Sequence, residues 1–250
     1  MWERYIKFFN LRNNLNCLNL IIIMKKKGGL MEGSKNYSKK THYYDLFSQA
    51  EDYPKKTFKF LDKKVKGKIV VDVGCGNGRY SKILAPKTKE YIGIDSSKQQ
   101  ITLAKRKTKT IKKASYIISP AESIPLKNNL ADVVISTWTV SAIKGFTRKA
   151  KALKEMGRIL KKGGEIYLVE NAPEGEFQEI REATEWTKRY EQWLKKKEFK
   201  KTKEIDTYFK FDSLRLAKKV FWFIWGDRIS NRIKSNRINQ KIIIFKRKKK

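Results

Sequence analysis

Residues 69–78 read IVVDVGCGNG, a β-branched run followed by glycines at alternate positions. A run of this length is typical of a strand buried in a parallel sheet, and the stretch from Arg79 to Ala85, which ends before Pro86, is predicted as a helix. Glycine suits a direct strand-to-helix turn because it accepts unusual backbone angles and lets a ligand approach closely. The segment therefore predicts the opening of a nucleotide-type βαβ unit, whose helix N-terminus offers free N–H groups to a ligand carboxylate.

The same alternation continues along the chain. It predicts an α/β fold with a doubly wound, mostly parallel sheet. Asp95 closes the second expected strand, where its carboxylate can accept both hydroxyls of a ribose; the alternative is helix capping before Ser96 and Ser97. The expected strands are 69–73, 91–95, 116–118, 132–136 and 165–170, and a helix over 146–160 is closed by Gly163 and Gly164.

The glycine spacing narrows the class of ligand. It is not the G-x-G-x-x-G of dinucleotide binders, and no G-x-x-x-x-G-K-[ST] phosphate loop is present. From Asp72 the chain reads DVGCGNG, which resembles the first motif of class I S-adenosylmethionine-dependent methyltransferases, particularly small type 11 domains. The resemblance runs from about Tyr43 to Glu170. It implies a Rossmann-like sheet of seven strands and S-adenosylmethionine as cofactor.

The resemblance also implies a set of cofactor-binding residues. Asp72, Gly74 and Gly76 would line the methionine part, and Asp95 the ribose. Ala121 would present a backbone N–H to the adenine, and Ser136 and Thr137 would lie beside the sulfonium. The chain departs from many relatives at Pro120, where they carry an acid, and at residues 140–142, where they carry paired histidines. The full expected set is Asp72, Gly74, Gly76, Gly78, Asp95, Ser96, Ala121, Glu122, Ser136 and Thr137.

A catalytic base is not evident in the sequence. In the resembled family an arm before the sheet often folds over the cofactor, with an aromatic residue near the methyl donor. The candidates in this arm are His42, Tyr43 and Tyr44; surface exposure of the histidine and simple packing of the tyrosines are the alternatives. The chain has two cysteines, Cys17 and Cys75, which is too few for a disulfide framework or a zinc site. A reducing cytoplasm is therefore the default location.

The chain divides into four expected regions. Residues 1–30 lack a clear period and are interpreted as an upstream extension or a flexible arm. Translation is expected to start at Met31; the alternatives are a start at Met24, or at Met1 with a genuine amphipathic arm. Residues 31–66 form a helical arm, 67–172 the cofactor-binding core, and 173–250 the helices and strands that complete the sheet.

The last region is predicted to insert a helix between two strands. That helix, containing residues 220–225 and ended by Gly226, is either a core element, the favoured interpretation, or a lid over the acceptor. A helix over 174–200 carries an apolar stripe typical of a core face. The stripe is Trp186, Tyr190, Trp193 and Leu194, and the two strands are 206–211 and 241–246.

Charge is the unusual feature of the composition. The 250 residues carry 59 Lys and Arg against 25 Asp and Glu, a net charge of +34, which either attracts a polyanion or reflects an A/T-rich coding bias. A hydrophobic content of 40% excludes a disordered chain, and no apolar segment approaches the ~20 residues of a membrane span, so no stable membrane association is expected.

These features together predict a methyltransferase acting on an anionic acceptor. RNA is slightly favoured over a small metabolite, because of the charge and because DVGCGNG followed by Arg79 and Tyr80 resembles methyltransferases of modified wobble uridines in transfer RNA. The alternative of another class is a catalytically inactive S-adenosylmethionine-binding regulatory protein.

Overall fold

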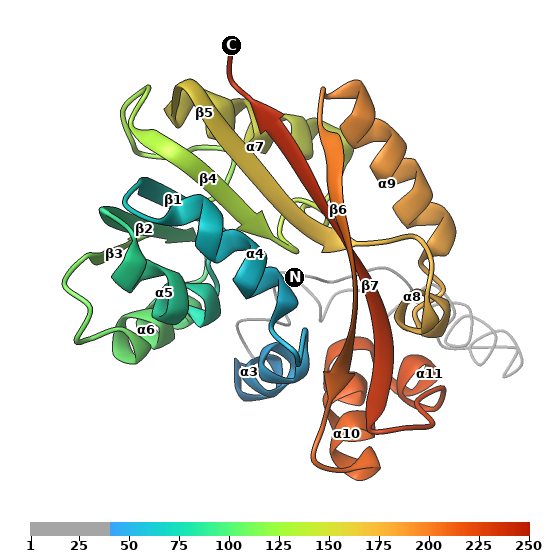
Figure 1. Ribbon diagram of the computed structural model, residues 1–250. Helices are drawn as coiled ribbons and strands as arrows, with labels where there is room; N and C mark the ends of the chain where they lie inside the picture. Colours follow the sequence, from blue (N-terminus) through green and yellow to red (C-terminus); the bar gives the residue numbers. More distant parts are fainter. Residues whose placement is uncertain (1–40) are drawn as a thin grey trace, which may run out of the picture. The chain divides into compact units, whose positions relative to one another are not determined.

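The computed structural model describes residues 41–250, so the predictions for residues 1–30 and for the start residue lie outside the described part. The sheet has seven strands in the order β3-β2-β1-β4-β5-β7-β6, which confirms the α/β prediction (Figure 1). The first five in that order are parallel, and β7 pairs antiparallel with both β5 and β6. The strands are β1 Ile69–Val73, β2 Glu90–Asp95, β3 Ala114–Ile118, β4 Ala131–Thr137, β5 Leu160–Asn171, β6 Lys200–Lys210 and β7 Arg237–Lys248.

Helices cover both faces of this sheet, because the buried strands alternate apolar side chains to each side. On one face α4 (Lys56–Val65) and α5 (Arg79–Leu84) pack through Leu61, Val65 and Leu84. On the other face α7 (Phe146–Ile159) and α9 (Thr184–Lys196) pack through Met156 and Leu194. The remaining helix of the parallel half is α6 (Lys98–Lys107), and a 3-10 turn, Ala85–Lys87, follows α5.

The prediction of a single helix over residues 174–200 is wrong. The chain forms α8 (Glu176–Ile180) and α9, separated by a turn in which Glu182 has a φ of 53°. The apolar side chains of the two helices pack in different hydrophobic cores. Ile180 of α8 packs in the core that contains α10, and Leu194 of α9 packs on the sheet. A straight helix cannot supply both, and β6 already begins at Lys200.

The expectation for the end of α7 is also corrected. The helix ends at Ile159 and β5 begins at the next residue, so Gly163 and Gly164 lie within the strand. A Cβ at Gly164 would lie 2.9 Å from the carbonyl oxygen of Asp132, which shows that the two strands approach closely there.

A third core joins the arm to the insertion between β6 and β7. It contains Phe47 of α3 (Thr41–Ala50), Phe177 of α8, and Val220 and Phe221 of α10 (Leu214–Trp225). The short α11 (Asp227–Ser230) adds Ile229. The inserted helix is thus a core element, and Figure 1 shows α3, α8, α10 and α11 beyond the carboxyl ends of the parallel strands.

Candidate cofactor and acceptor site

The glycine loop lies where the strand order reverses between β1 and β4, the position at which open α/β sheets bind their ligands. The backbone N–H groups of Gly74 and Cys75 both donate to the carbonyl of Ile94, at 2.7 and 2.9 Å. A Cβ at Gly74 would lie 2.0 Å from Thr139 Oγ1, so that glycine is required by packing. A Cβ at Gly76 would meet nothing nearer than the Tyr44 ring at 3.9 Å, which leaves space above the loop.

Asp95 ties this loop to the end of β2. One carboxylate oxygen accepts from the N–H of Gly76 at 3.0 Å and the other from the N–H of Ser97 at 2.8 Å. Each oxygen has a further lone pair, the capacity that two ribose hydroxyls require. Burial raises the pKa of Asp95, against these two hydrogen bonds. The cap of α6 is Ser97, whose Oγ accepts from Gln100 N, and Ser96 is exposed beside it.

Asp72 lies inside the sheet below the loop. The Tyr91 hydroxyl donates to one of its oxygens, and the other, Oδ1, has no hydrogen-bond partner among the described residues. Burial raises the pKa of this carboxyl to about 7. Of the expected set, Asp72 is therefore a fully buried carboxyl, and burial brings its pKa close to neutral pH.

The end of β4 contributes one buried and one accessible residue. Ser136 Oγ donates to the carbonyl of Val73 at 2.8 Å and so joins β4 to β1. Thr137 is partly exposed, and its carbonyl accepts from Thr139 Oγ1 at 3.1 Å. The two positions predicted to lie beside the sulfonium thus border the loop, but the Ser136 hydroxyl is already engaged.

The loop after β3 lies next to Asp95. The N–H of Ser119 donates to the Asp95 carbonyl at 3.1 Å, which brings Ala121 and Glu122 to the same end of the sheet. The Glu122 carboxylate pairs with Arg148 of α7 at 2.7 Å. The structure therefore gathers all ten predicted cofactor residues around adjacent strand ends.

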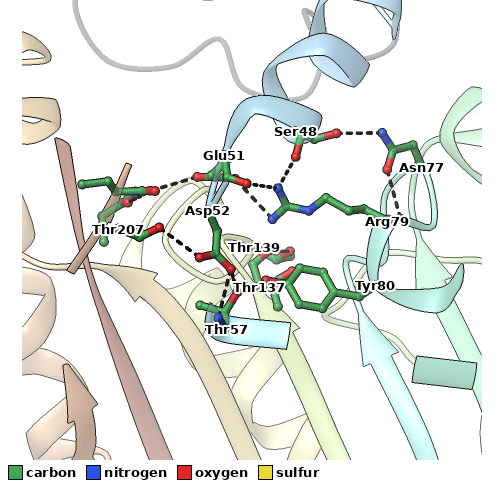
Figure 2. Close-up of polar contacts among 12 residues, drawn as sticks. Ser48, Glu51, Asp52, Thr57, Asn77, Arg79, Tyr80, Thr137, Thr139 and Thr207 are labelled. Carbon is green, nitrogen blue, oxygen red and sulfur yellow. Dashed lines mark hydrogen bonds and ion pairs between the residues drawn. The ribbon is translucent and has the colours of Figure 1, made fainter. Parts of the chain in front are cut away.

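The arm is bonded directly to the glycine loop, through residues outside the predicted cofactor-binding set (Figure 2). Asn77 Nδ2 donates to Asp45 Oδ1 at 2.6 Å and to Ser48 Oγ at 3.0 Å. Arg79 donates to the carbonyls of Ser48 and Glu51 and forms an ion pair with the Glu51 carboxylate at 3.4 Å. Its guanidinium also contacts the rings of Phe58, Tyr80 and Trp138, 5.0 to 5.6 Å from their centroids.

Two adjacent acids at the end of α3 extend this network across the sheet (Figure 2). Glu51 accepts from Gln240 of β7 at 3.0 Å, and burial raises its pKa to about 7 although the charge of Arg79 opposes that shift. Asp52 accepts from the N–H and hydroxyl of Thr57 and from the hydroxyl of Thr207. These residues lie up to 189 positions apart in the sequence, so no local pattern indicates that they form a network. The one local signal is the Arg79-Tyr80 pair that follows the glycine motif.

The three catalytic candidates of the arm occupy different environments. His42 is exposed and makes an edge contact with Tyr43. Tyr43 stacks on Phe223 of α10, with ring centroids 3.6 Å apart. Tyr44 lies closest to the glycine loop, as its ring borders the space above Gly76.

Comparisons with known proteins agree with this geometry. Residues 71–168 match the family model described as a methyltransferase domain. The chain is similar to the tRNA (carboxymethyluridine(34)-5-O)-methyltransferase of Arabidopsis thaliana, with 29% identity over 54% of this chain and 32% of that protein. It is also similar to the demethylmenaquinone methyltransferase of Bacillus licheniformis, with 28% identity over 55% of this chain and 59% of that protein. The chain thus spans less than two thirds of either relative.

A solved structure supports the same fold. The N-methyltransferase NodS of Bradyrhizobium japonicum, in complex with S-adenosyl-L-homocysteine, has a TM-score of 0.52 and 13% identity over 82% of this chain and 97% of that chain. The fold and the position of the glycine loop are those of class I methyltransferases. The match of residues 71–168 supports the assignment of this segment to a class I methyltransferase of type 11.

The site residues fit the cofactor of this class. The space above Gly76 and the remaining lone pairs of Asp95 are features that a ligand with an amino-acid part and a ribose would use. The methyltransferase domain and the similar structure with bound S-adenosyl-L-homocysteine support S-adenosylmethionine as the cofactor. Within residues 41–250, no three His, Cys, Asp or Glu side chains are grouped to hold a metal ion, and none of the helices has the length and apolar character to cross a membrane.

Proposed function

We propose that the protein transfers a methyl group from S-adenosylmethionine to an anionic acceptor, with RNA favoured. The observation that carries this proposal is the attachment of Gly76 to Asp95 beside open space at the strand ends. When bound, S-adenosylmethionine would supply the methyl group: an acceptor atom would bond to the methyl carbon as the carbon–sulfur bond breaks, and S-adenosylhomocysteine would leave. The ten residues predicted from the sequence are proposed to hold that cofactor.

The chain's own part in such a reaction is alignment and exclusion of water. Asn77 and Arg79 hold α3 against the glycine loop, so the arm covers one side of the site. Arg79 is mostly buried and ion-paired, which keeps its planar group in one orientation. These contacts order the loop before the acceptor arrives.

Proton removal from an oxygen or nitrogen acceptor needs a group that titrates near neutral pH. Glu51 and Asp72 are buried carboxyls with pKa values of about 7, whereas His42 is exposed on the arm. Methylation of an atom that is already nucleophilic needs no base. We therefore assign no catalytic residue and keep Tyr44, which borders the loop, as the arm residue proposed to contact the cofactor.

RNA is favoured by the net charge of +34 and by the resemblance of the glycine motif to that of wobble-uridine methyltransferases. The similarity to a tRNA methyltransferase adds support, and the equal similarity to a demethylmenaquinone methyltransferase supports the second candidate, a small-molecule acceptor. The cytoplasm is the expected location, because the described cysteine, Cys75, is free and buried.

The test is incubation with methyl-labelled S-adenosylmethionine and a fractionated extract. Label in the RNA fraction is the expected result, and label in small molecules alone replaces RNA with a metabolite. Label in no fraction, together with calorimetric binding of the cofactor, favours the regulatory, cofactor-binding alternative.

A further inference from the structure

The turn between α3 and α4 covers the free edge of the sheet. β6 is the last strand in the sheet order, so one side of its backbone is unpaired by any strand of the described chain. The N–H of Tyr53 donates to the Tyr208 carbonyl at 3.0 Å, and Lys56 Nζ donates to the Asp206 carbonyl at 2.6 Å. The turn thereby protects the edge and fixes Tyr53 beside β6.

Aromatic and cationic side chains alternate at this edge. The rings of Tyr53 and Tyr208 have centroids 5.8 Å apart, and the Arg237 guanidinium lies 3.9 Å from the centre of the Tyr208 ring. Tyr53 is 52% exposed, although most large apolar side chains of the protein are buried. Arg237 is exposed and pairs in register with Lys210 on the same face of the two strands. We call this surface the β6-edge patch: Tyr53, Lys55, Lys56, Tyr208, Lys210 and Arg237.

The chemistry of the patch selects a ligand with both flat rings and negative charge. Exposed aromatic faces stack on bases, and neighbouring cations neutralise phosphates, which is the combination used for single-stranded nucleic acid. Unpaired nucleotides expose their faces, whereas a duplex buries them in its own stack. Asp206 is an exposed acid next to the patch, and the cations Lys55, Lys56, Lys210 and Arg237 outnumber it.

The patch is joined to the candidate site through one residue. Asp52 precedes Tyr53, and its carboxylate bonds Thr207, the neighbour of Tyr208. It also bonds Thr57, whose hydroxyl lies 2.7 Å from that of Tyr80, the residue after Arg79 (Figure 2). A chain bound at the patch therefore lies on the outer side of the network that holds the arm to the glycine loop.

We propose that unpaired nucleotides of an RNA bind at the β6-edge patch, stacking on Tyr53 beside the Tyr208–Arg237 pair. This inference rests on the proposed function, since it names the surface that would hold an RNA acceptor. It is separate from the chemistry, because binding at the patch needs neither the cofactor nor a methyl transfer.

The experiment measures binding of a fluorescent 12-nucleotide oligouridine RNA to the full chain over a series of salt concentrations. Tyr53→Ala is expected to weaken binding about tenfold and Tyr53→Phe to leave it unchanged, because a phenyl ring still stacks. Arg237→Ala is expected to reduce the slope of log K against log salt by about 0.7, the value for one phosphate contact on a single strand. Arg106→Ala is the matched control, because Arg106 is an exposed arginine on α6. It should change the affinity by less than about twofold, and it should change the slope by less than Arg237→Ala does.

Three results would overturn the proposal. The first is that Tyr53→Ala binds the RNA as tightly as the wild type does. The second is that Arg237→Ala and Arg106→Ala lose RNA affinity equally, and the third is that the wild type binds a 12-base-pair duplex as tightly as the single strand. A fourth arm uses vesicles of anionic phospholipid: if Tyr53→Ala impairs vesicle binding and not RNA binding, the patch contacts a membrane surface instead. Calorimetry with S-adenosylmethionine separates the proposals, since Tyr53→Ala should bind the cofactor as the wild type does, and absence of that binding in both proteins rejects the proposed function alone.

Discussion

At the scale of single residues, Asp95 is the group whose loss should act most directly on the cofactor. Asp95→Ala removes the acceptor proposed for the ribose and releases the N–H of Gly76. We expect S-adenosylmethionine binding to weaken by about tenfold or more, as charge-assisted hydrogen bonds are lost. Isothermal calorimetry measures this. Asp132→Asn is the control, because Asp132 accepts from Ile69 N at the opposite end of the strands and should not affect cofactor affinity; equal affinity of Asp95→Ala and wild type would refute the ribose assignment.

Gly74 and Gly76 are two residues apart and should respond differently to alanine. At Gly74 the new Cβ would overlap the Thr139 side chain at 2.0 Å, so Gly74→Ala should lower the free energy of unfolding by several kcal/mol, about 2 or more. At Gly76 the Cβ enters open space with a φ of +53°, so Gly76→Ala should cost about 1 kcal/mol and mainly weaken cofactor binding. Urea denaturation and calorimetry separate the two effects. Thr139→Gly, which removes all three overlapping atoms, should partly rescue Gly74→Ala, and equal stability of both glycine variants contradicts this account.

Arg79 and Glu51 form a buried pair whose members should be strongly coupled. Arg79→Met leaves the Glu51 carboxylate without its cation, which raises the Glu51 pKa further and should cost about 3 kcal/mol of unfolding free energy at pH 8. Because a neutral amide needs no counter-charge, Glu51→Gln in the same chain should recover part of that loss. Chemical denaturation of the two single variants and the double variant gives the coupling energy. A double variant as unstable as the sum of its parts would show that the pair is not coupled.

At the scale of elements, the loop between β4 and α7 is held by one buried pair. Lys149 of α7 donates to the carbonyls of Val140 and Ser141, at 3.1 and 2.8 Å. Glu170 of β5 accepts from Ser141 N at 3.2 Å and from the Tyr190 hydroxyl at 3.0 Å. A lysine and a glutamate from neighbouring elements therefore determine the position of this loop.

This pair makes stability depend on pH. Burial raises the pKa of Glu170 from 4.5 to about 7, so between these values the folded chain keeps a proton that the unfolded chain loses. The contribution is fully present below about pH 4.5 and is lost as the pH rises to 7, up to about 3 kcal/mol. In denaturation experiments between pH 5 and 7.5, Glu170→Gln should make that decline smaller by up to about 3 kcal/mol. The part due to Glu51 and Asp72, whose pKa values burial also raises to about 7, should remain. Glu185→Gln, at an exposed glutamate on α9, should leave it unchanged, and an equal decline in Glu170→Gln would contradict the assignment.

At the scale of the whole molecule, we expect translation to begin at Met31. Residues 1–30 hold six Lys and Arg and one Glu, so a chain from Met31 keeps a net charge of +29 and remains strongly basic. Mass spectrometry of the natural protein should find Met31, or the residue after it, at the N-terminus. A peptide containing Trp2 or Cys17 would rule this out.

The pattern of residues along the chain was enough to predict the parallel half of the sheet, the glycine loop and the position of Asp95. These are local features: β-branched runs, glycine spacing and strand ends lie within a few residues of one another, so their pattern is visible along the chain. The interruption of the expected helix at Glu182 could not be predicted from the local pattern. It arises because Ile180 and Leu194 pack in two separate hydrophobic cores.

The contacts between distant polar residues could not be predicted in this way, because they depend on the folding of the whole chain. Glu51, Arg79, Thr207 and Gln240 have no shared pattern in the sequence, yet they lie in one buried network where the arm, the glycine loop and the last two strands converge. Burial then raises the pKa of Glu51 to about 7, a property that neither the residue type nor its neighbours in the chain indicate. The physical reason is that hydrogen bonding and desolvation act through space, and the fold brings these groups out of water together.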